Sequence, residues 1–131
     1  MKVLALDYGS ARTGVAVSDP TGTLARPVEV VQHARSESGL ARIAELVREH
    51  QAERVVVGLP LTMGGEHGRQ AAETEEFVSL LEGALDVPIE SFDERFTTDL
   101  AEQGGGSNEE DARAAAHLLS SYLTWSSSAP R

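Results

Sequence analysis

Residues 2–19 read KVLALDYGSARTGVAVSD, and this stretch decides the fold. Residues 2–7 are an almost continuous apolar run that ends on Asp7, which is typical of a strand buried on both faces. A turn over residues 9–12 follows, and residues 13–18 read as a second apolar strand. The short link between these strands favours an antiparallel pair with Asp7 at the carboxyl end of its first strand.

A third strand is expected over residues 24–32, after the strong turn signal of residues 19–22. Pro27 lies within this strand, and proline cannot donate a hydrogen bond to a neighbouring strand. Its presence predicts a sheet edge or a bulge. The first three strands therefore form an antiparallel meander.

The pattern then changes to an alternation of helices and strands. Apolar residues at helical spacing predict helices, and short apolar runs between them predict strands. We predict an α/β fold whose mixed five-stranded sheet has three antiparallel strands, then two parallel strands, with helices on both faces. The expected helices cover residues 39–50, 70–85 and 108–123, and the expected strands cover 53–58 and 87–92.

The chain of 131 residues is expected to form a single domain over residues 1–131, with a frayed serine-rich tail over 125–131. It has no cysteine, which excludes disulfides and thiolate metal sites and fits a reducing compartment. No stretch resembles a signal peptide or a membrane span, so we expect a cytoplasmic protein. The net charge of −10 argues against a broad basic surface, so nucleic acid could be bound only where the few cations concentrate.

Acidic residues follow the strands that should lie at the centre of the sheet. Right-handed crossovers place the fourth strand beside the first and the fifth beside the fourth, so their carboxyl ends share one edge. Asp7 ends the first strand, and Asp93 and Glu94 follow the fifth. Gly58 ends the fourth strand and leaves space between them.

Asp111 lies in the first turn of the final helix, on the face that also carries residues 115, 118 and 122. Because that face packs on the sheet, this carboxylate is expected near Asp7 and Glu94. Carboxylates brought together repel one another unless divalent cations lie between them. Mg²⁺ and Mn²⁺ prefer oxygen ligands, and a pair of such ions can promote phosphodiester hydrolysis. We predict that the three acids are catalytic and bind Mg²⁺ or Mn²⁺.

Each acid also has a structural interpretation. Asp7 could only begin the turn that follows it. Asp111 could complement the helix dipole, and for this residue alone the two interpretations are balanced. For Asp93 we favour a turn residue paired with Arg95.

Four blocks of the sequence resemble the YqgF/RuvX family, in family order and over nearly the whole chain. They are residues 7–19 (DYGSARTGVAVSD), 57–68 (VGLPLTMGGEHG), 93–98 (DERFTT) and 111–123 (DARAAAHLLSSYL). The resemblance implies a ribonuclease-H-like fold and a metal-dependent nuclease, with a homodimer expected. By position, it implies that the catalytic carboxylates are Asp7, Glu94 and Asp111. The segment 99–107 is shorter than the family usually has, and the family's segment is often basic, which weakens the expected hold on nucleic acid.

Four further residues are predicted to bind substrate, namely Arg12, Arg69, Arg95 and Thr97. Arginine suits two-pronged phosphate contacts, and Arg69 lies at a helix start that could receive a phosphate. Arg95 could equally pair with Asp93 or Glu94 to hold the turn. Thr97 or its neighbour could instead cap a short helix.

We predict a metal-dependent endonuclease that cuts structured nucleic acid. The resemblance to the YqgF/RuvX family implies the 5′ end of pre-16S rRNA as the favoured substrate, and it implies a Holliday junction resolvase acting on branched DNA as one alternative. A second is a non-catalytic module that binds nucleic acid or protein. A third is an ATP-dependent phosphotransferase, since residues 7–9 also resemble the phosphate loop of actin-like ATPases, although this chain supplies only one of the two domains they need.

Overall fold

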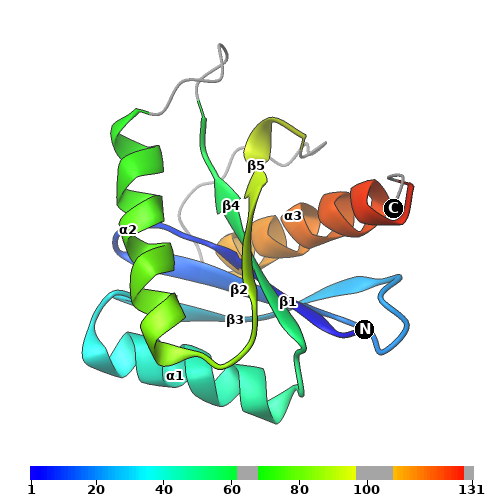
Figure 1. Cartoon of the computed structure of the whole chain (residues 1–131), viewed down its shortest axis with the longest axis horizontal. Coiled ribbons are helices and arrows are strands. Elements are labelled where there is room, and N and C mark those ends of the chain that lie inside the picture. Colours follow the sequence, from blue (N-terminus) through cyan, green and yellow to red (C-terminus); the bar gives the residue numbers. More distant parts are fainter. Residues whose placement is uncertain (62–67, 97–107, 129–131) are drawn as a thin grey trace.

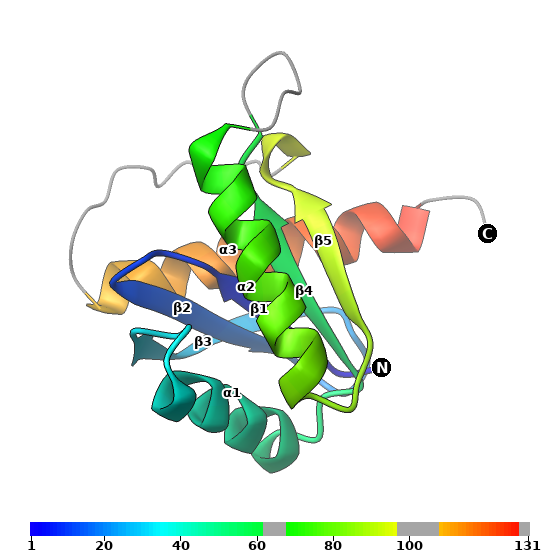
Figure 2. The ribbon, with the colours of Figure 1, turned by 60° about the vertical axis from the view of Figure 1, so that its left-hand side comes forward.

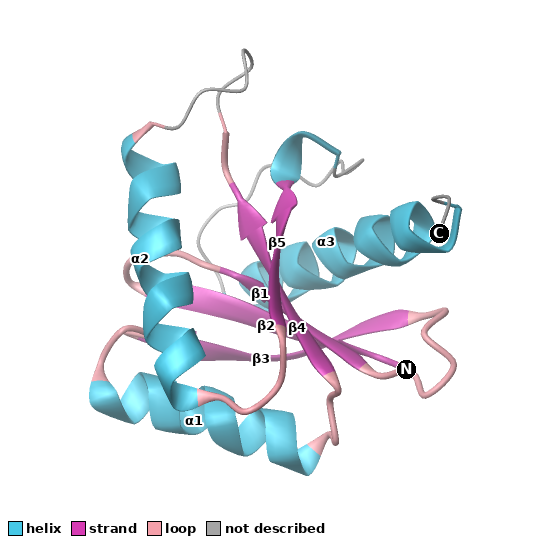
Figure 3. Ribbon diagram, in the orientation of Figure 1, coloured by secondary structure: helices cyan, strands magenta, loops and turns pink. Residues whose placement is uncertain are grey.

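The computed structural model describes residues 1–61, 68–96 and 108–128. Five strands form one sheet in the order β3-β2-β1-β4-β5, with three α-helices packed around it (Figures 1 and 3). The chain runs through β1 (Val3–Asp7), β2 (Arg12–Ser18), β3 (Ala25–Gln32), α1 (Glu37–Glu49), β4 (Arg54–Leu59), α2 (Arg69–Ala84), β5 (Ile89–Asp93), a 3₁₀ turn (Glu94–Phe96) and α3 (Asn108–Ser128).

The strand directions confirm the predicted topology. Strands β1, β2 and β3 pair antiparallel, and β4 lies parallel to β1 and to β5. β3 is an edge strand, and its register with β2 shifts because Val15 pairs with Glu29 whereas Ala16 pairs with Pro27. Pro27 therefore lies on an edge strand and beside a bulge, in agreement with both structural roles predicted from the sequence.

Helices cover both faces of the sheet, as predicted. α1 and α2 lie on one face and α3 crosses the other, which is clearest when Figures 1 and 2 are compared. Side chains alternate along a strand, so β1 serves both layers. Leu4 and Leu6 belong to the core beneath α1 and α2, whereas Val3 and Ala5 belong to the core beneath α3. By the same alternation Asp7 follows Val3 and Ala5 toward the α3 face.

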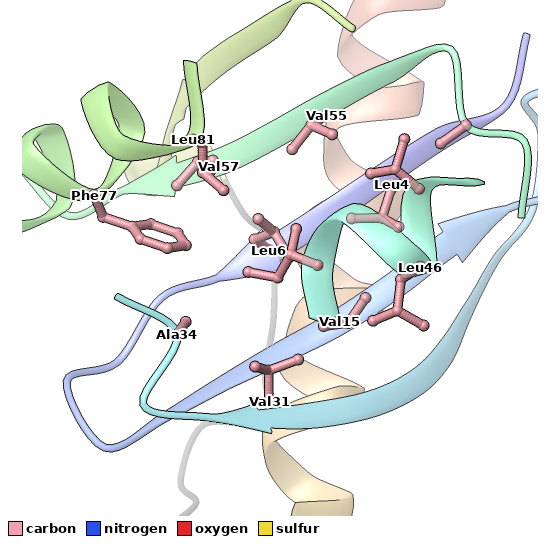
Figure 4. Packing of buried hydrophobic residues seen from close by; sticks show 13 residues of the cluster. Leu4, Leu6, Val15, Val31, Ala34, Leu46, Val55, Val57, Phe77 and Leu81 are labelled. Atoms are coloured by element: carbon pink, nitrogen blue, oxygen red, sulfur yellow. The ribbon is translucent and has the colours of Figure 1, made fainter. Parts of the chain in front are cut away.

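The larger core is built from branched aliphatic residues and one phenylalanine. Figure 4 shows Phe77 and Leu81 of α2 and Leu46 of α1 above the strands, and all three are almost fully buried. Full burial of such side chains stabilises the fold by about 1.5–3 kcal/mol each. This layer fixes α2 relative to the ends of β1 and β4, where the acidic residues lie.

The chain's later elements differ from the prediction in two respects. α3 continues to Ser128, beyond its predicted end at residue 123, while the fraying expected of residues 125–131 stays a prediction. Trp125 packs against Phe92 at 5.6 Å and Tyr122 at 6.0 Å between ring centroids, which ties down the last turns. The 3₁₀ turn after β5 was not predicted.

Candidate active site

Asp7, Glu94 and Asp111 are placed by three separate elements at the carboxyl edge of the sheet. Asp7 ends β1, Glu94 opens the 3₁₀ turn directly after β5, and Asp111 lies in the first turn of α3. Because β1, β4 and β5 are parallel, their carboxyl ends share an edge. The predicted juxtaposition of these ends is therefore present in the fold.

Gly14 brings the start of α3 onto the sheet. It pairs with Asp7 in the register of β1 and β2. A Cβ atom added at Gly14 would lie 1.9 Å from the carbonyl oxygen of Asp111, closer than any side chain tolerates. Only glycine allows the helix backbone to approach β2 here, directly beside the strand position of Asp7.

Gly58 makes room for Glu94 on the same face. A Cβ atom at this position would lie 2.7 Å from Oε2 of Glu94 and 3.1 Å from Cδ2 of Leu118. The glutamate side chain therefore lies against the backbone of β4, the strand between β5 and β1. This contact supports the prediction that Gly58 leaves space for the acidic residues around it.

Asp7 and Glu94 form a coupled pair of carboxyl groups. Burial and, to a smaller extent, the charge of Asp111 together raise the pKa of Asp7 to about 6, although a hydrogen bond with Glu94 opposes the shift. Burial also raises the pKa of Glu94 to about 7, assisted by the charge of Asp7. Two carboxylates in hydrogen-bond contact share a proton near neutral pH, because both cannot ionise cheaply without a cation.

Asp111 is turned toward Arg12. Its Oδ2 lies 2.9 Å from Nε of Arg12, and the two side chains are 29% and 32% exposed. That oxygen is itself buried and makes no hydrogen bond among the described residues, so the contact is a charge contact without hydrogen-bond alignment. The helix dipole is thus not the only positive partner of Asp111, because the guanidinium group of Arg12 also holds its side chain.

The donor set suits a hard divalent cation, although the acids do not yet surround a common point. Among residues 1–61, 68–96 and 108–128, no three acidic or histidine side chains are grouped closely enough to bind one ion. The available donors are nevertheless all carboxylate oxygens, the ligands that Mg²⁺ and Mn²⁺ prefer. The shared proton of Asp7 and Glu94 and the unsatisfied Oδ2 of Asp111 are features that a cation would relieve.

A cavity of about 210 Å³ opens beside the coupled pair. Asp7 and Glu94 contribute to its lining, and the first turns of α2 form one wall through Gln70, Glu73 and Thr74. Sequence reasoning missed Glu73 as a residue of this site. The spacing of these three residues, at i, i+3 and i+4 with Thr74 buried, was the signal that could have found it.

Tyr8, which follows Asp7, was also missed, and it anchors the loop that lines the cavity. Its ring stacks on Phe77 with centroids 4.4 Å apart, and its hydroxyl group lies near Arg35. Arg35 in turn pairs with Glu76 of α2 at 3.1 Å. β1 and α2 are therefore connected directly behind the candidate site.

The predicted substrate-binding residues differ in their surroundings. Arg95 folds back onto Asp93, with its Nη2 donating to Oδ2 at 2.6 Å and its Nε to Oδ1 at 3.1 Å. This pairing confirms the turn interpretation of Asp93. Arg69 is exposed at the start of α2 and has no ion pair within the described part of the chain. Thr97 lies outside the described residues.

Residues 1–125 match the RuvX family, whose description is Holliday junction resolvase. A "Putative pre-16S rRNA nuclease" of Chloroflexus aggregans is 50% identical over 101 residues, covering 77% of this chain and 71% of the relative. One of the same name from Anaeromyxobacter sp. is 42% identical over 132 residues, covering 94% and 96%.

Solved structures with the same fold are RuvC proteins of Thermus thermophilus. One has a TM-score of 0.60 at 20% identity, covering 96% of this chain and 97% of that protein. A second, in complex with a Holliday junction substrate, has a TM-score of 0.56 at 21% identity and covers 95% of both chains. None of the helices in the described residues has the length and apolar content that crossing a membrane requires. The chain therefore belongs to the YqgF/RuvX family of nucleases, with a ribonuclease-H-like α/β fold.

Proposed function

We propose that this protein is a divalent-metal-dependent endonuclease that hydrolyses phosphodiester bonds in structured nucleic acid. One observation carries the proposal. Asp7, Glu94 and Asp111, distant in sequence, lie on three elements at the carboxyl edge of the sheet, and the pKa values of Asp7 and Glu94 are raised to about 6 and about 7. Perturbed acids beside a cavity are typical of catalytic sites.

Asp7, Glu94 and Asp111 would hold Mg²⁺ or Mn²⁺ in this mechanism. When bound, such ions lower the pKa of a water molecule and neutralise charge on the departing oxygen. The chain's own residues contribute the rest. Asp7 and Glu94 give up the proton they share and present two oxygens from β1 and the turn after β5. Arg12 and Arg69 bind flanking phosphates, and Gly14 and Gly58 keep the carboxylates close.

The favoured substrate is pre-16S rRNA, because relatives up to 50% identical are named "Putative pre-16S rRNA nuclease", and we expect the cut at its 5′ end. Branched DNA is the second candidate, since the family description is that of a Holliday junction resolvase. Either polymer offers the same phosphodiester to the carboxylates. Contacts outside the reacting group therefore decide between them.

Matched substrates test the proposal directly. Purified protein with Mn²⁺ is incubated with a 5′-extended 16S rRNA precursor fragment, its DNA counterpart and a four-way DNA junction. We expect cleavage of the precursor RNA that Asp7→Asn abolishes and that Glu29→Gln, a change on the opposite flank, leaves intact. Cleavage of the junction alone would support the resolvase. Binding without cleavage by both the wild type and Asp7→Asn would support a non-catalytic module.

The charge of the chain limits how nucleic acid can be held. Acidic residues outnumber Lys and Arg by 21 to 11, and two of the predicted phosphate ligands, Arg12 and Arg95, are already ion-paired. We expect weak binding by one copy, steeply reduced by salt. We expect a single-domain chain that works in the cytoplasm as a homodimer. A homodimer would present two nucleic-acid-binding surfaces, and sedimentation at several protein concentrations would detect it.

A further inference from the structure

We infer that Arg12 is a positioning residue that holds Asp111 away from the other two acids until a phosphate of the nucleic acid takes its place. The inference rests on the proposed function and adds a regulatory property to it. Substrate binding and metal binding are coupled through one ion pair.

The position of the Asp111 side chain is the first step. Oδ2 lies 2.9 Å from Nε of Arg12, while Asp7 pairs with Glu94. This oxygen is buried and lacks a hydrogen bond among the described residues, so the N–H group of Arg12 contacts it by charge without pointing at it. A buried carboxylate oxygen without a hydrogen bond is costly and readily accepts a better ligand.

The backbone around this pair restricts what can move. A Cβ atom built at Gly14 would lie 1.9 Å from the carbonyl oxygen of Asp111, so the start of α3 already lies against β2. Rotation of the carboxylate would then bring it closer to Asp7, whose pKa the charge of Asp111 already raises. The ion pair with Arg12 opposes that rotation.

A phosphate competes for Arg12 on favourable terms. The guanidinium group can offer two parallel hydrogen bonds to a phosphate, whereas its present contact with Asp111 is a single poorly aligned one. The Arg12 side chain is about one-third exposed and thus reachable by a polymer. Phosphate binding would release Asp111 to the cation, and by linkage the cation would strengthen phosphate binding by the same factor.

Arg12→Gln provides the test, with Mn²⁺ affinity measured by calorimetry on the intact protein. We expect Arg12→Gln to bind Mn²⁺ about 5–10-fold more tightly than the wild type without nucleic acid, within the usual range of such couplings. A phosphodiester oligonucleotide should raise the Mn²⁺ affinity of the wild type by a similar factor and that of Arg12→Gln hardly at all. An uncharged methylphosphonate oligonucleotide should have no effect, and titration into oligonucleotide alone corrects for Mn²⁺ that it binds.

Arg95→Gln is the matched control because it removes the same charge from the residue next to Glu94. Arg95 pairs with Asp93, which is not a proposed ligand. If both variants raised Mn²⁺ affinity equally, general electrostatics would explain the effect and the inference would be wrong. No change in Arg12→Gln would overturn it as well.

Arg12→Lys guards against a folding defect, which circular dichroism would also reveal. Lysine keeps a positive charge beside Asp111 but cannot offer phosphate a two-pronged contact. We expect near wild-type Mn²⁺ affinity and a weaker response to the oligonucleotide. If the wild type cleaves RNA and binds Mn²⁺ but the oligonucleotide does not change its Mn²⁺ affinity, only this inference is rejected. Wild-type protein that binds no Mn²⁺ would reject the proposed function and the inference together.

Discussion

Carboxylates have opposite environments at the carboxyl edge of the sheet and on the far side of the sheet, the β3 flank. On the flank, Glu29 of β3 receives two hydrogen bonds from Arg42 of α1, at 2.7 and 2.8 Å, which lower the pKa of the glutamate. At the edge, burial raises the pKa of Asp7 and of Glu94, and no arginine lowers either pKa. The paired carboxylate on the flank stabilises the folded chain. The carboxylates at the edge repel one another when ionised, and a bound cation would relieve that repulsion.

The C-terminal half of α3 resembles the flank, because its polar side chains have hydrogen-bond partners. Tyr122 donates to Glu90 at 2.8 Å and accepts from Arg54 at 3.0 Å, so helix, β4 and β5 are joined by satisfied groups. α3 thus contacts a satisfied network near one end and carries Asp111, with its unsatisfied oxygen, near the other. The contrast predicts that mutations will separate stability from activity.

Replacing one carboxylate in each region by the corresponding amide should have the largest effect on cleavage and stability. Asp7→Asn should lower cleavage on the order of 10³-fold or more, because it removes a metal ligand. It should also raise the melting temperature at pH 8 by a few degrees, since an amide can donate to Glu94 and no charge is buried. Glu29→Gln should retain cleavage and lose about 1 kcal/mol of unfolding free energy.

Single-turnover cleavage and urea unfolding measure the two quantities on the same samples. The comparison between the regions would fail if Asp7→Asn destabilised the protein as much as Glu29→Gln does. Such a result would mean that Asp7 is mainly a structural residue.

Two glycines provide the second contrast. An alanine at Gly58 would place Cβ 2.7 Å from Oε2 of Glu94, so the carboxylate must shift and cleavage should fall about 10–100-fold. An alanine at Gly83, in the last turn of α2, meets nothing within 4 Å. It should keep activity and add up to about 1 kcal/mol of stability through helix propensity. Equal activity of both variants would show that Glu94 tolerates displacement.

The protonation of Asp7 and Glu94 should make the free energy of unfolding depend on pH between about pH 5 and 8. The pKa values of Asp7 and Glu94 rise from 3.8 to about 6 and from 4.5 to about 7, so the folded state binds more protons than the unfolded chain there. Unfolding free energy must then fall as pH rises through this range. Without added metal, the melting temperature should be several degrees higher at pH 5 than at pH 8.

Two controls sharpen that measurement. The double variant Asp7→Asn with Glu94→Gln should show little slope across this range. Adding Mn²⁺ to the wild type at pH 8 should raise its melting temperature by binding the folded state. A slope that persisted in the double variant would assign the pH dependence to other groups.

Most of the fold could be predicted because its signals are local. The apolar runs of β1 and β4 mark strands buried on both faces, and Pro27 marks the edge of the sheet. The end of α3 could not be predicted, because serines weaken the helical pattern there while Trp125 is held by aromatic contacts with β5 and the preceding turn. Such contacts depend on tertiary packing rather than on neighbouring residues.

The site could be predicted only in part for a similar reason. Chain topology indicates that Asp7 and Glu94 share an edge, and the structure adds that they form a hydrogen-bonded pair. Side-chain partners were not available from the pattern. The pairing of Arg12 with Asp111 depends on the contact of α3 with Gly14, which joins residues almost a hundred positions apart.

The smallest expected effect comes from the satisfied end of α3. Tyr122→Phe keeps the ring contacts with Phe92 and Trp125 but removes the hydroxyl group between Glu90 and Arg54. These two residues still lie 3.4 Å apart, so the loss of unfolding free energy should be only about 1 kcal/mol. Cleavage should be unchanged, because Asp111 is three helical turns away from Tyr122. A parallel loss of cleavage would show that the position of α3 at Asp111 depends on this network, and the two regions could then no longer be treated as independent.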